Sequence, residues 1–182
     1  MHRPELHAAN VLNAAVAALA RELEAATVAS AAGPGGRGAA LTALAAFASG
    51  SPIDRLAWSL QLSHSRMVRV VDRLEQDGLV TRTRGTADRR AVLVTLTEAG
   101  RRVAREITDA RLALLQEDVA ALDEADREAL ARICAAILAR RIGTARAAER
   151  TCRFCDPDAC GHHDGHCPVT QAADVHRARG AA

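Results

Sequence analysis

Lysine is absent from the sequence, aromatic residues are scarce, and no long apolar run occurs. Aromatic residues make up 2% of the chain and alanine supplies much of its 49% hydrophobic content, a composition that favours helices over β-sandwiches. The richest apolar stretch, residues 8–20, is dominated by alanine and bounded by charge, so it does not predict a membrane span. A basic segment followed by an apolar core and a cleavage site is also missing. We therefore expect a mainly helical, cytoplasmic protein with no membrane partner.

A strong excess of charge of one sign is lacking as well. The formal net charge is +2, and all 24 basic side chains counted as Lys or Arg are arginine. Any surface for nucleic acid must therefore be local, because no global basic field exists. The 182 residues are enough for one domain of ordinary size with appendages.

The centre of the chain has the pattern of a helix-turn-helix. Apolar residues recur at helical spacing after residue 62: Met67, Val70, Val71 and Leu74. Arginines lie on the other faces, Ser63 can cap the helix, and Gly78 can end it. A preceding helix is expected to start at Ser51 as its cap, with Pro52 at the first helical position. An arginine-bearing second helix can enter a DNA major groove, whereas an ordinary solvated amphipathic helix is the alternative.

Two strands should follow as a hairpin. Residues 80–84 and 91–96 alternate and are rich in β-branched side chains, with a turn at residues 85–90 between them. Asp88, Arg89 and Arg90 lie at the tip. A tip of this charge can reach the DNA backbone or minor groove, and a solvated loop is the alternative.

Long helices are expected on both sides of this unit. One covers residues 5–30, ahead of a glycine-rich connector at 33–38, and others begin after the caps Thr97 and Asp123, the last reaching about Arg150. Cys134 falls on the apolar stripe of that last helix and is predicted to be a core residue. The terminal helices carry more apolar surface than a small winged helix can cover, which favours pairing with a second copy.

In this order of elements, residues 8–148 resemble the MarR family of bacterial winged-helix regulators. The resemblance rests on LSHSRMVRVVDRLEQDGLVTR (Leu62–Arg82) and DRRAVLVTLTEAGR (Asp88–Arg101). It implies a fold that is mainly α with a small β-hairpin, a winged helix-turn-helix flanked by dimerisation helices. We divide the chain into an N-terminal dimerisation helix with connector (1–38), the DNA-binding domain (39–100), C-terminal dimerisation helices (101–150) and a Cys/His-rich tail (151–182).

The resemblance also implies a function without catalysis. The expected protein is a homodimeric transcriptional regulator, typically a repressor, that binds a pseudo-palindromic operator in double-stranded DNA. A small-molecule effector, a metal or oxidation would release it. Aromatic-type residues near the effector cleft are Phe47, Trp58 and His64, although Trp58 also suits simple packing.

Individual DNA contacts are assigned by position. The helix residues that match the family's DNA-facing positions, together with Arg73 on the basic face, are Ser63, His64, Ser65, Arg66, Arg69 and Arg73. In the hairpin, Asp88 is expected to orient Arg90, with Arg89 beside them. Val68 departs from the polar residue often found at its position and could touch a thymine methyl group.

The tail falls outside this family pattern. Its cysteines have the spacing C-x2-C-x4-C-x6-C, with three histidines as alternate ligands: Cys152, Cys155, Cys160 and Cys167, then His162, His163 and His166. Glycines and prolines oppose regular secondary structure here, and four thiolates suit tetrahedral zinc. An iron–sulfur cluster, a thiol–disulfide switch and a disordered end are the alternatives.

The tail also allows two rival functions. It could form a zinc-stapled protein-interaction module or hold the metal of a metal-dependent enzyme. The motifs H-x-E…P-C-x-x-C and H-E-x-x-H do not occur, nor does a nucleophile elbow or a phosphate loop. We therefore predict that the protein is not an enzyme.

Overall fold

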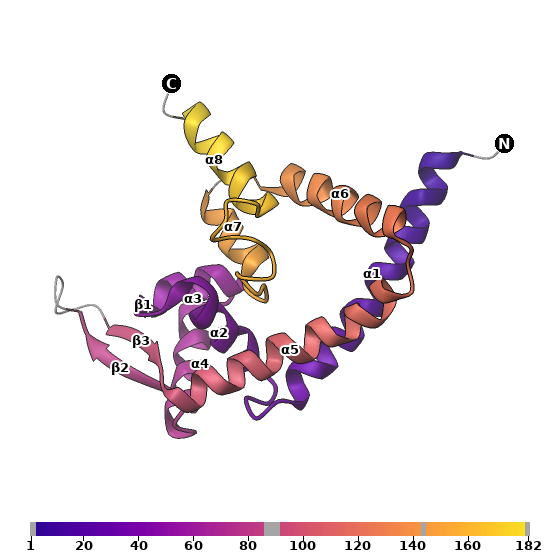
Figure 1. Cartoon of the computed structure of the whole chain (residues 1–182). Helices are drawn as coiled ribbons and strands as arrows, with labels where there is room; N and C mark the ends of the chain where they lie inside the picture. The colour runs from indigo at the N-terminus through magenta and orange to yellow at the C-terminus, as the bar shows by residue number, and fades with distance from the viewer. Residues whose placement is uncertain (1–2, 86–91, 143–144, 181–182) are drawn as a thin grey trace.

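The computed structural model describes residues 3–85, 92–142 and 145–180 (Figure 1). The elements, in chain order, are α1 (Pro4–Ala29), α2 (Arg37–Ala43), the π-helical turn η1 (Leu44–Ala48), β1 (Ser51–Pro52), α3 (Ile53–Leu60), α4 (His64–Gln76), β2 (Val80–Arg84), β3 (Val92–Leu96), α5 (Glu98–Ala120), α6 (Glu124–Arg141), α7 (Ala145–Cys152) and α8 (Pro168–Gly180). A mainly helical protein with a small antiparallel sheet is thus confirmed.

Side-chain caps open three of the helices as the sequence predicts. Ser63 Oγ accepts from the backbone N–H of Arg66 at 3.3 Å at the start of α4. Thr97 Oγ1 accepts from the N–H of Gly100 at 3.0 Å at the start of α5. Asp123 does the same at the start of α6. Each cap satisfies an N–H that has no partner within its helix, which fixes where the helix begins.

The start of α3 differs from the prediction. Ser51 and Pro52 are not a cap and a first helical residue, because they form β1, which pairs antiparallel with β3 through Ser51↔Val94 and Pro52↔Leu93. A residue before proline prefers the extended conformation, and proline tolerates an edge strand. The sheet therefore has three strands in the order β1-β3-β2 instead of a simple hairpin.

The main core lies between α2, α3, α4, the sheet and the first turns of α5. The apolar stripe of α4 is buried as predicted: Met67, Val70, Val71 and Leu74. Gly100 lets α5 approach the strand entry closely, since a Cβ added there would lie 1.9 Å from the carbonyl oxygen of Leu79. This contact fixes the angle at which α5 leaves the sheet.

α1 and α5 pack side by side and extend away from this core (Figure 1). Their outer surfaces and that of α6 remain apolar and exposed, with Leu12 46%, Val16 57% and Ile133 50% accessible. Cys134 is exposed as well, so its predicted burial in the core does not occur within one chain. Within the described residues, none of the helices combines the length and hydropathy that crossing a bilayer needs.

The tail folds back onto the rest of the chain. The helix predicted to reach Arg150 ends at Arg141, and α7 forms a separate helix after residues 143–144. Figure 1 shows α7 and the following loop between α3 and α6, with α8 packed on α6 and α7. A second small apolar cluster forms here, made of Ile142, Cys167, Val169 and Ala173.

Candidate nucleic-acid interface and the cysteine cluster of the tail

The side of α4 opposite its apolar stripe faces solvent. All six residues predicted there for DNA contact are exposed: Ser63, His64, Ser65, Arg66, Arg69 and Arg73. The geometry follows from the helix repeat, because the stripe anchors one side and leaves the basic side free of the core. Val68, by contrast, is half-buried and packs against the core.

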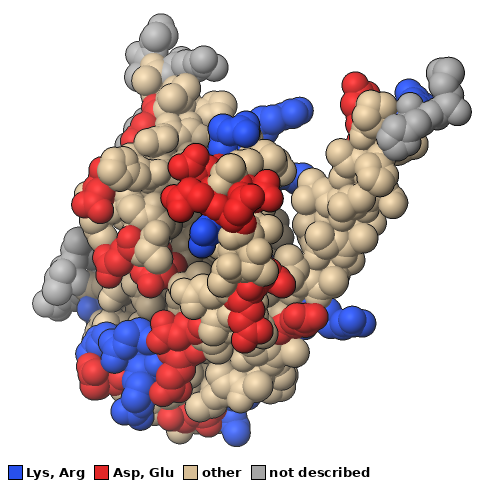
Figure 2. All heavy atoms as spheres, turned by 45° about the vertical axis from the view of Figure 1, so that its right-hand side comes forward, with Lys and Arg blue, Asp and Glu red and all other residues tan. Residues whose placement is uncertain are grey.

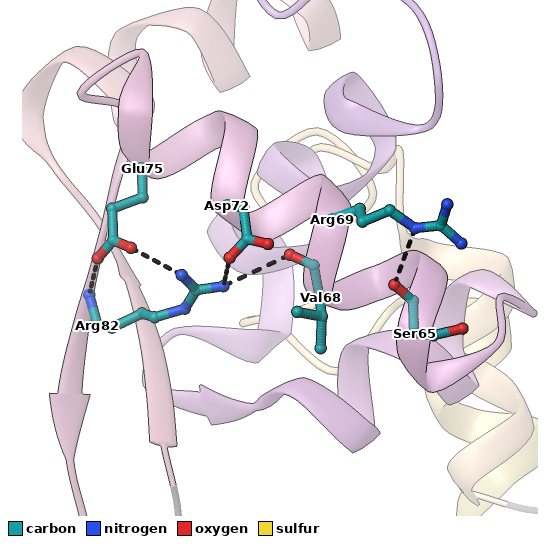
Figure 3. A network of polar contacts seen from close by, with 6 residues as sticks. All are labelled: Ser65, Val68, Arg69, Asp72, Glu75 and Arg82. Atoms are coloured by element: carbon teal, nitrogen blue, oxygen red, sulfur yellow. Dashed lines mark hydrogen bonds and ion pairs between the residues drawn. The ribbon is translucent and has the colours of Figure 1, made fainter.

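Local contacts orient several of these side chains. Arg69 Nε donates to the carbonyl oxygen of Ser65 at 3.4 Å, and its guanidinium points outward beyond that contact (Figure 3). His64 Nδ1 lies 2.5 Å from Asp54 Oδ1, which ties the first turn of α4 to α3. The hydroxyls of Ser63 and Ser65 are 3.3 Å apart. These contacts orient the first two turns of α4 on the exposed face.

An open groove of about 340 Å³ runs along this face beside the glycine-rich connector. Its lining includes four arginines: Arg37, Arg66, Arg69 and Arg73. Sequence reasoning missed Arg37, because it stands in a stretch that reads only as a flexible connector. In the structure Arg37 opens α2 and its Nη1 lies 2.8 Å from Asp77 Oδ2, which places it beside the end of α4. A groove with this lining suits a phosphate.

Arg82 connects the sheet to α4 (Figure 3). Its guanidinium lies 2.7 Å from Asp72 Oδ1 and 2.7 Å from Glu75 Oε2, and it also donates to the carbonyl oxygen of Val68 at 3.4 Å. Its backbone N–H donates to Glu75 Oε1 at 3.2 Å. This network, which sequence periodicity does not reveal, holds β2 at a fixed angle to α4.

The sequence also predicts DNA contacts at the hairpin tip. Asp88, Arg89 and Arg90 lie outside the described residues, whereas β2 and β3 on either side are described. In the view of Figure 2, blue and red side chains are mixed at the lower left, over the end of the molecule that carries the winged helix. This agrees with the low net charge of +2, which leaves no basic field over the whole molecule.

The tail cysteines, Cys152, Cys155, Cys160 and Cys167, come together around one cavity. This cavity of about 200 Å³ is also lined by Phe47, Glu149 and His162. Cys152 ends α7, Cys155 and Cys160 lie in the loop, and Cys167 directly precedes α8. His163 and His166, both described and both exposed, are not among its lining residues.

The thiols are close enough to change one another's pKa. The pKa of Cys155 is lowered to about 7, first by a hydrogen bond from Cys152 and then by the nearby Arg111 guanidinium. The same hydrogen bond, with burial, raises the pKa of Cys152. Burial, followed by the neighbouring Cys167, raises the pKa of Cys160 to about 11. Among the described residues, no group of three or more potential ligands lies at the spacing of a single-ion site.

Polar contacts join α7 to α3. Glu149 accepts two hydrogen bonds from Arg55, at 2.7 and 3.2 Å, and one from Ser59 Oγ at 3.1 Å. The hydrogen bond from Arg55 to Glu149 raises the pKa of that arginine. Arg150 lies over the ring of Trp58, 4.0 Å from its centroid, and donates to the Trp58 carbonyl oxygen at 3.3 Å. Trp58 is therefore a packing residue for the tail.

A second contact joins the tail loop to the long helices. Arg111 of α5 lies over the ring of Phe154, 3.9 Å from its centroid, and donates to the Leu23 carbonyl oxygen at 2.7 Å and to Thr27 Oγ1 at 3.0 Å. Burial lowers the pKa of Arg111. One arginine thus connects α1, α5 and the tail.

Known proteins share both a sequence segment and the fold with this chain. Residues 48–92 match the family model described as the MarR family. No curated protein matches the chain. Among solved structures, a MarR family protein from Bacillus stearothermophilus has 22% identity and a TM-score of 0.66, covering 75% of this chain and 95% of its own. YusO from Bacillus subtilis has 23% identity and a TM-score of 0.63, covering 75% and 97%.

A further neighbour was solved with nucleic acid. A single-residue mutant of MepR from S. aureus, bound to an oligodeoxyribonucleotide, has 18% identity and a TM-score of 0.56 and covers 72% of this chain and 96% of its own. Such identities establish the common fold. Residues 48–92 thus match the MarR family model, and the chain as a whole shares its winged-helix fold with solved proteins of that family.

Proposed function

We propose that the protein is a homodimeric transcriptional regulator that binds a specific sequence in double-stranded DNA and acts as a repressor. The observation that carries the proposal is the face of α4. It presents Arg66, Arg69 and Arg73 to solvent on a helix whose other side is fixed in the core. Arginine forms bidentate hydrogen bonds with the guanine edge in the major groove, so an exposed arginine row on a rigid helix suits base recognition.

The groove beside α4 supports a second kind of contact. Arg37 and Arg73 are both held by Asp77, at 2.8 and 3.5 Å. Arginines positioned in this way can fix a phosphate and with it the register of the helix on the duplex. MepR, a structural neighbour, was solved with an oligodeoxyribonucleotide, which supports the assignment of this fold to DNA binding.

The exposed apolar surface of α1 and α6 favours a homodimer. Leu12, Val16, Leu130 and Ile133 are each between 39% and 57% accessible. α6 has no buried residue among its 18 even though α8 packs on it, so most of its apolar surface is open to a further partner. Two copies joined through these helices would present two α4 helices to successive half-sites of an operator.

Release by an effector is part of the same proposal. A cavity of about 370 Å³ lies between η1, the first half of α5 and the tail loop at residues 155–158. Its position between the long helices and the winged helix suits a ligand that changes their relative placement. The rival functions, a protein-interaction module or a metal-dependent enzyme, gain no support from the contacts of the described residues.

Gel-shift titration tests DNA binding. DNA from upstream of the protein's own gene is titrated with wild type, with Arg66→Ala/Arg69→Ala, and with a control of equal charge change, Arg21→Ala/Arg140→Ala. We expect the first pair to weaken specific binding by about 1–3 kcal/mol per lost base contact and the control to change it little. Equal weakening by both pairs would show non-specific attraction and overturn sequence-specific recognition.

Sedimentation velocity tests the dimer. Val16→Glu/Ile133→Glu should shift the protein towards monomer, because a charge would be buried in the proposed interface. Arg66→Ala/Arg69→Ala should remain dimeric. A wild type that sediments as a monomer at micromolar concentration would refute the homodimer.

A further inference from the structure

The loop that carries the tail cysteines is shaped by its own hydrogen bonds. Asp156 Oδ1 accepts from the backbone N–H groups of Asp158 and Ala159, and Gly161 takes a positive φ of 66° in the next turn. The N–H of Cys155 donates to the Cys152 carbonyl oxygen at 3.0 Å. These turns direct all four sulfur-bearing residues towards one cavity instead of dispersing them along the loop.

The apolar core beneath this loop is small. The apolar cluster beneath it contains Ile142, Cys167, Val169 and Ala173, which is a small core for a segment that extends from α7 to α8. Small cysteine-rich segments without a sufficient core gain stability from a metal or from disulfides. The five cysteines of the protein are free thiols in this structure.

We propose that the tail cysteines bind a thiophilic metal centre in their shared cavity and that this centre holds α7 against α3. On binding, each thiol loses its proton to solvent and its sulfur donates a lone pair to the metal, with no change of oxidation state. Four thiolates around a divalent ion carry a net negative charge. The Arg111 guanidinium beside Cys155 lies where it offsets that charge.

Two metal centres share this donor chemistry, a single zinc ion and an iron–sulfur cluster. Zinc requires the four sulfurs to close to about 2.3 Å from the ion. The cavity of about 200 Å³ is larger than one ion needs, and the described ligands do not converge at single-ion spacing. A zinc centre would therefore require the loop to close inward, whereas a larger iron–sulfur cluster would require less closure.

A chain of contacts joins the metal centre to α4 through α7 and α3. Cys152 is the last residue of α7, and Glu149 and Arg150 on the preceding turn contact Arg55 and Trp58 of α3. α3 packs directly on α4. The consequence for DNA, which rests on the proposed function, is that metal occupancy adjusts the orientation of α4.

Metal analysis of the intact chain is the first test. The protein is purified with and without oxygen, and zinc, iron and acid-labile sulfide are measured beside the visible spectrum. We expect about one zinc per chain and no colour, or about four iron and four sulfide per chain with a brown anaerobic protein. Cys155→Ser and Cys160→Ser should each lower the retained metal at least tenfold, whereas Cys134→Ser, on exposed α6, should retain it fully.

Trp58 provides the second test, because it is the only tryptophan in the chain. Removal of the metal should release Arg150 from the indole ring, shift the emission of Trp58 and speed tryptic cleavage after Arg150 and Arg153. In Arg150→Ala the shift should already be present with metal bound. This readout does not involve DNA, so it separates the metal centre from the proposed function.

Several results would overturn the proposal. The first such result has two parts. Wild-type protein would hold no metal after either preparation, and it would bind added zinc no more tightly than a variant with all tail cysteines replaced by serine. Another is protein without metal in which mass spectrometry finds the tail cysteines paired as two disulfides. Unchanged Trp58 emission and tryptic cleavage on metal removal would refute the connection to α3. Metal-dependent emission without any DNA binding would instead count against the proposed function alone.

Discussion

The position of the hairpin against α4 should depend on Arg82, and Arg82→Ala tests this dependence. The Arg82 side chain is 23% exposed, and its partners Asp72 and Glu75 are 46% and 40% exposed, so water screens both ion pairs. Pairs of this exposure contribute about 0.2–1 kcal/mol each. With the packing of the arginine stem added, the replacement should lower the free energy of unfolding by about 1–2 kcal/mol.

Urea denaturation followed by Trp58 fluorescence measures the change. Arg84→Ala is the matched control, since it removes the same charge from an exposed site on the same strand and should cost less than about 0.5 kcal/mol. A double-mutant cycle of Arg82→Ala with Glu75→Gln should give a coupling of about 0.5–1 kcal/mol that falls as salt is added. If Arg82→Ala and Arg84→Ala lower the free energy of unfolding equally, or if the cycle shows no coupling, the network does not hold the hairpin.

Three further changes test the packing of the winged helix by thermal or urea denaturation. Gly100→Ala should destabilise the fold by about 3 kcal/mol or more, because the new Cβ would lie 1.9 Å from the Leu79 carbonyl oxygen and the backbone must move. Thr97→Ala should cost about 1–2 kcal/mol, since Thr97 caps α5 and donates to the Gly78 carbonyl oxygen at 2.8 Å; Thr97→Ser should recover most of this loss. Leu74→Ala should cost about 2–5 kcal/mol, because Leu74 is fully buried, and a loss below about 1 kcal/mol would contradict its place in the core.

Local patterns in the sequence predicted much of this fold. The caps Ser63, Thr97 and Asp123 and the stop at Gly78 depend on residues within one helical turn, and all four are confirmed. The buried stripe of α4 follows from its spacing alone. The order of the flanking helices followed from their apolar spacing and their caps, and the MarR resemblance rested on that order together with the segments Leu62–Arg82 and Asp88–Arg101.

Contacts between distant residues could not be predicted in this way. The strand β1 exists because Ser51 pairs with Val94, and local preference at Ser51 fits a helix cap equally well. Glu149 meets Arg55, which is 94 residues away in sequence. The exposure of Cys134 has a related cause. The apolar stripe of its helix indicates that this side of the helix packs against a partner, but it does not indicate whether the partner belongs to the same chain.

The contacts around α4 set a limit on what the tail can do. The apolar stripe of α4 contributes several kcal/mol to the stability of the fold. The polar contact between α4 and β2 through Arg82 contributes about 1 kcal/mol, and so does the contact between α3 and α7 through Glu149. Loss of the α7 contact would therefore leave α4 folded and change only its orientation. Because about 1.4 kcal/mol corresponds to a tenfold change in affinity, one contact of about 1 kcal/mol accounts for a change in DNA binding of about fivefold per subunit. A larger response to metal would require the tail to move the two subunits of the proposed dimer relative to each other.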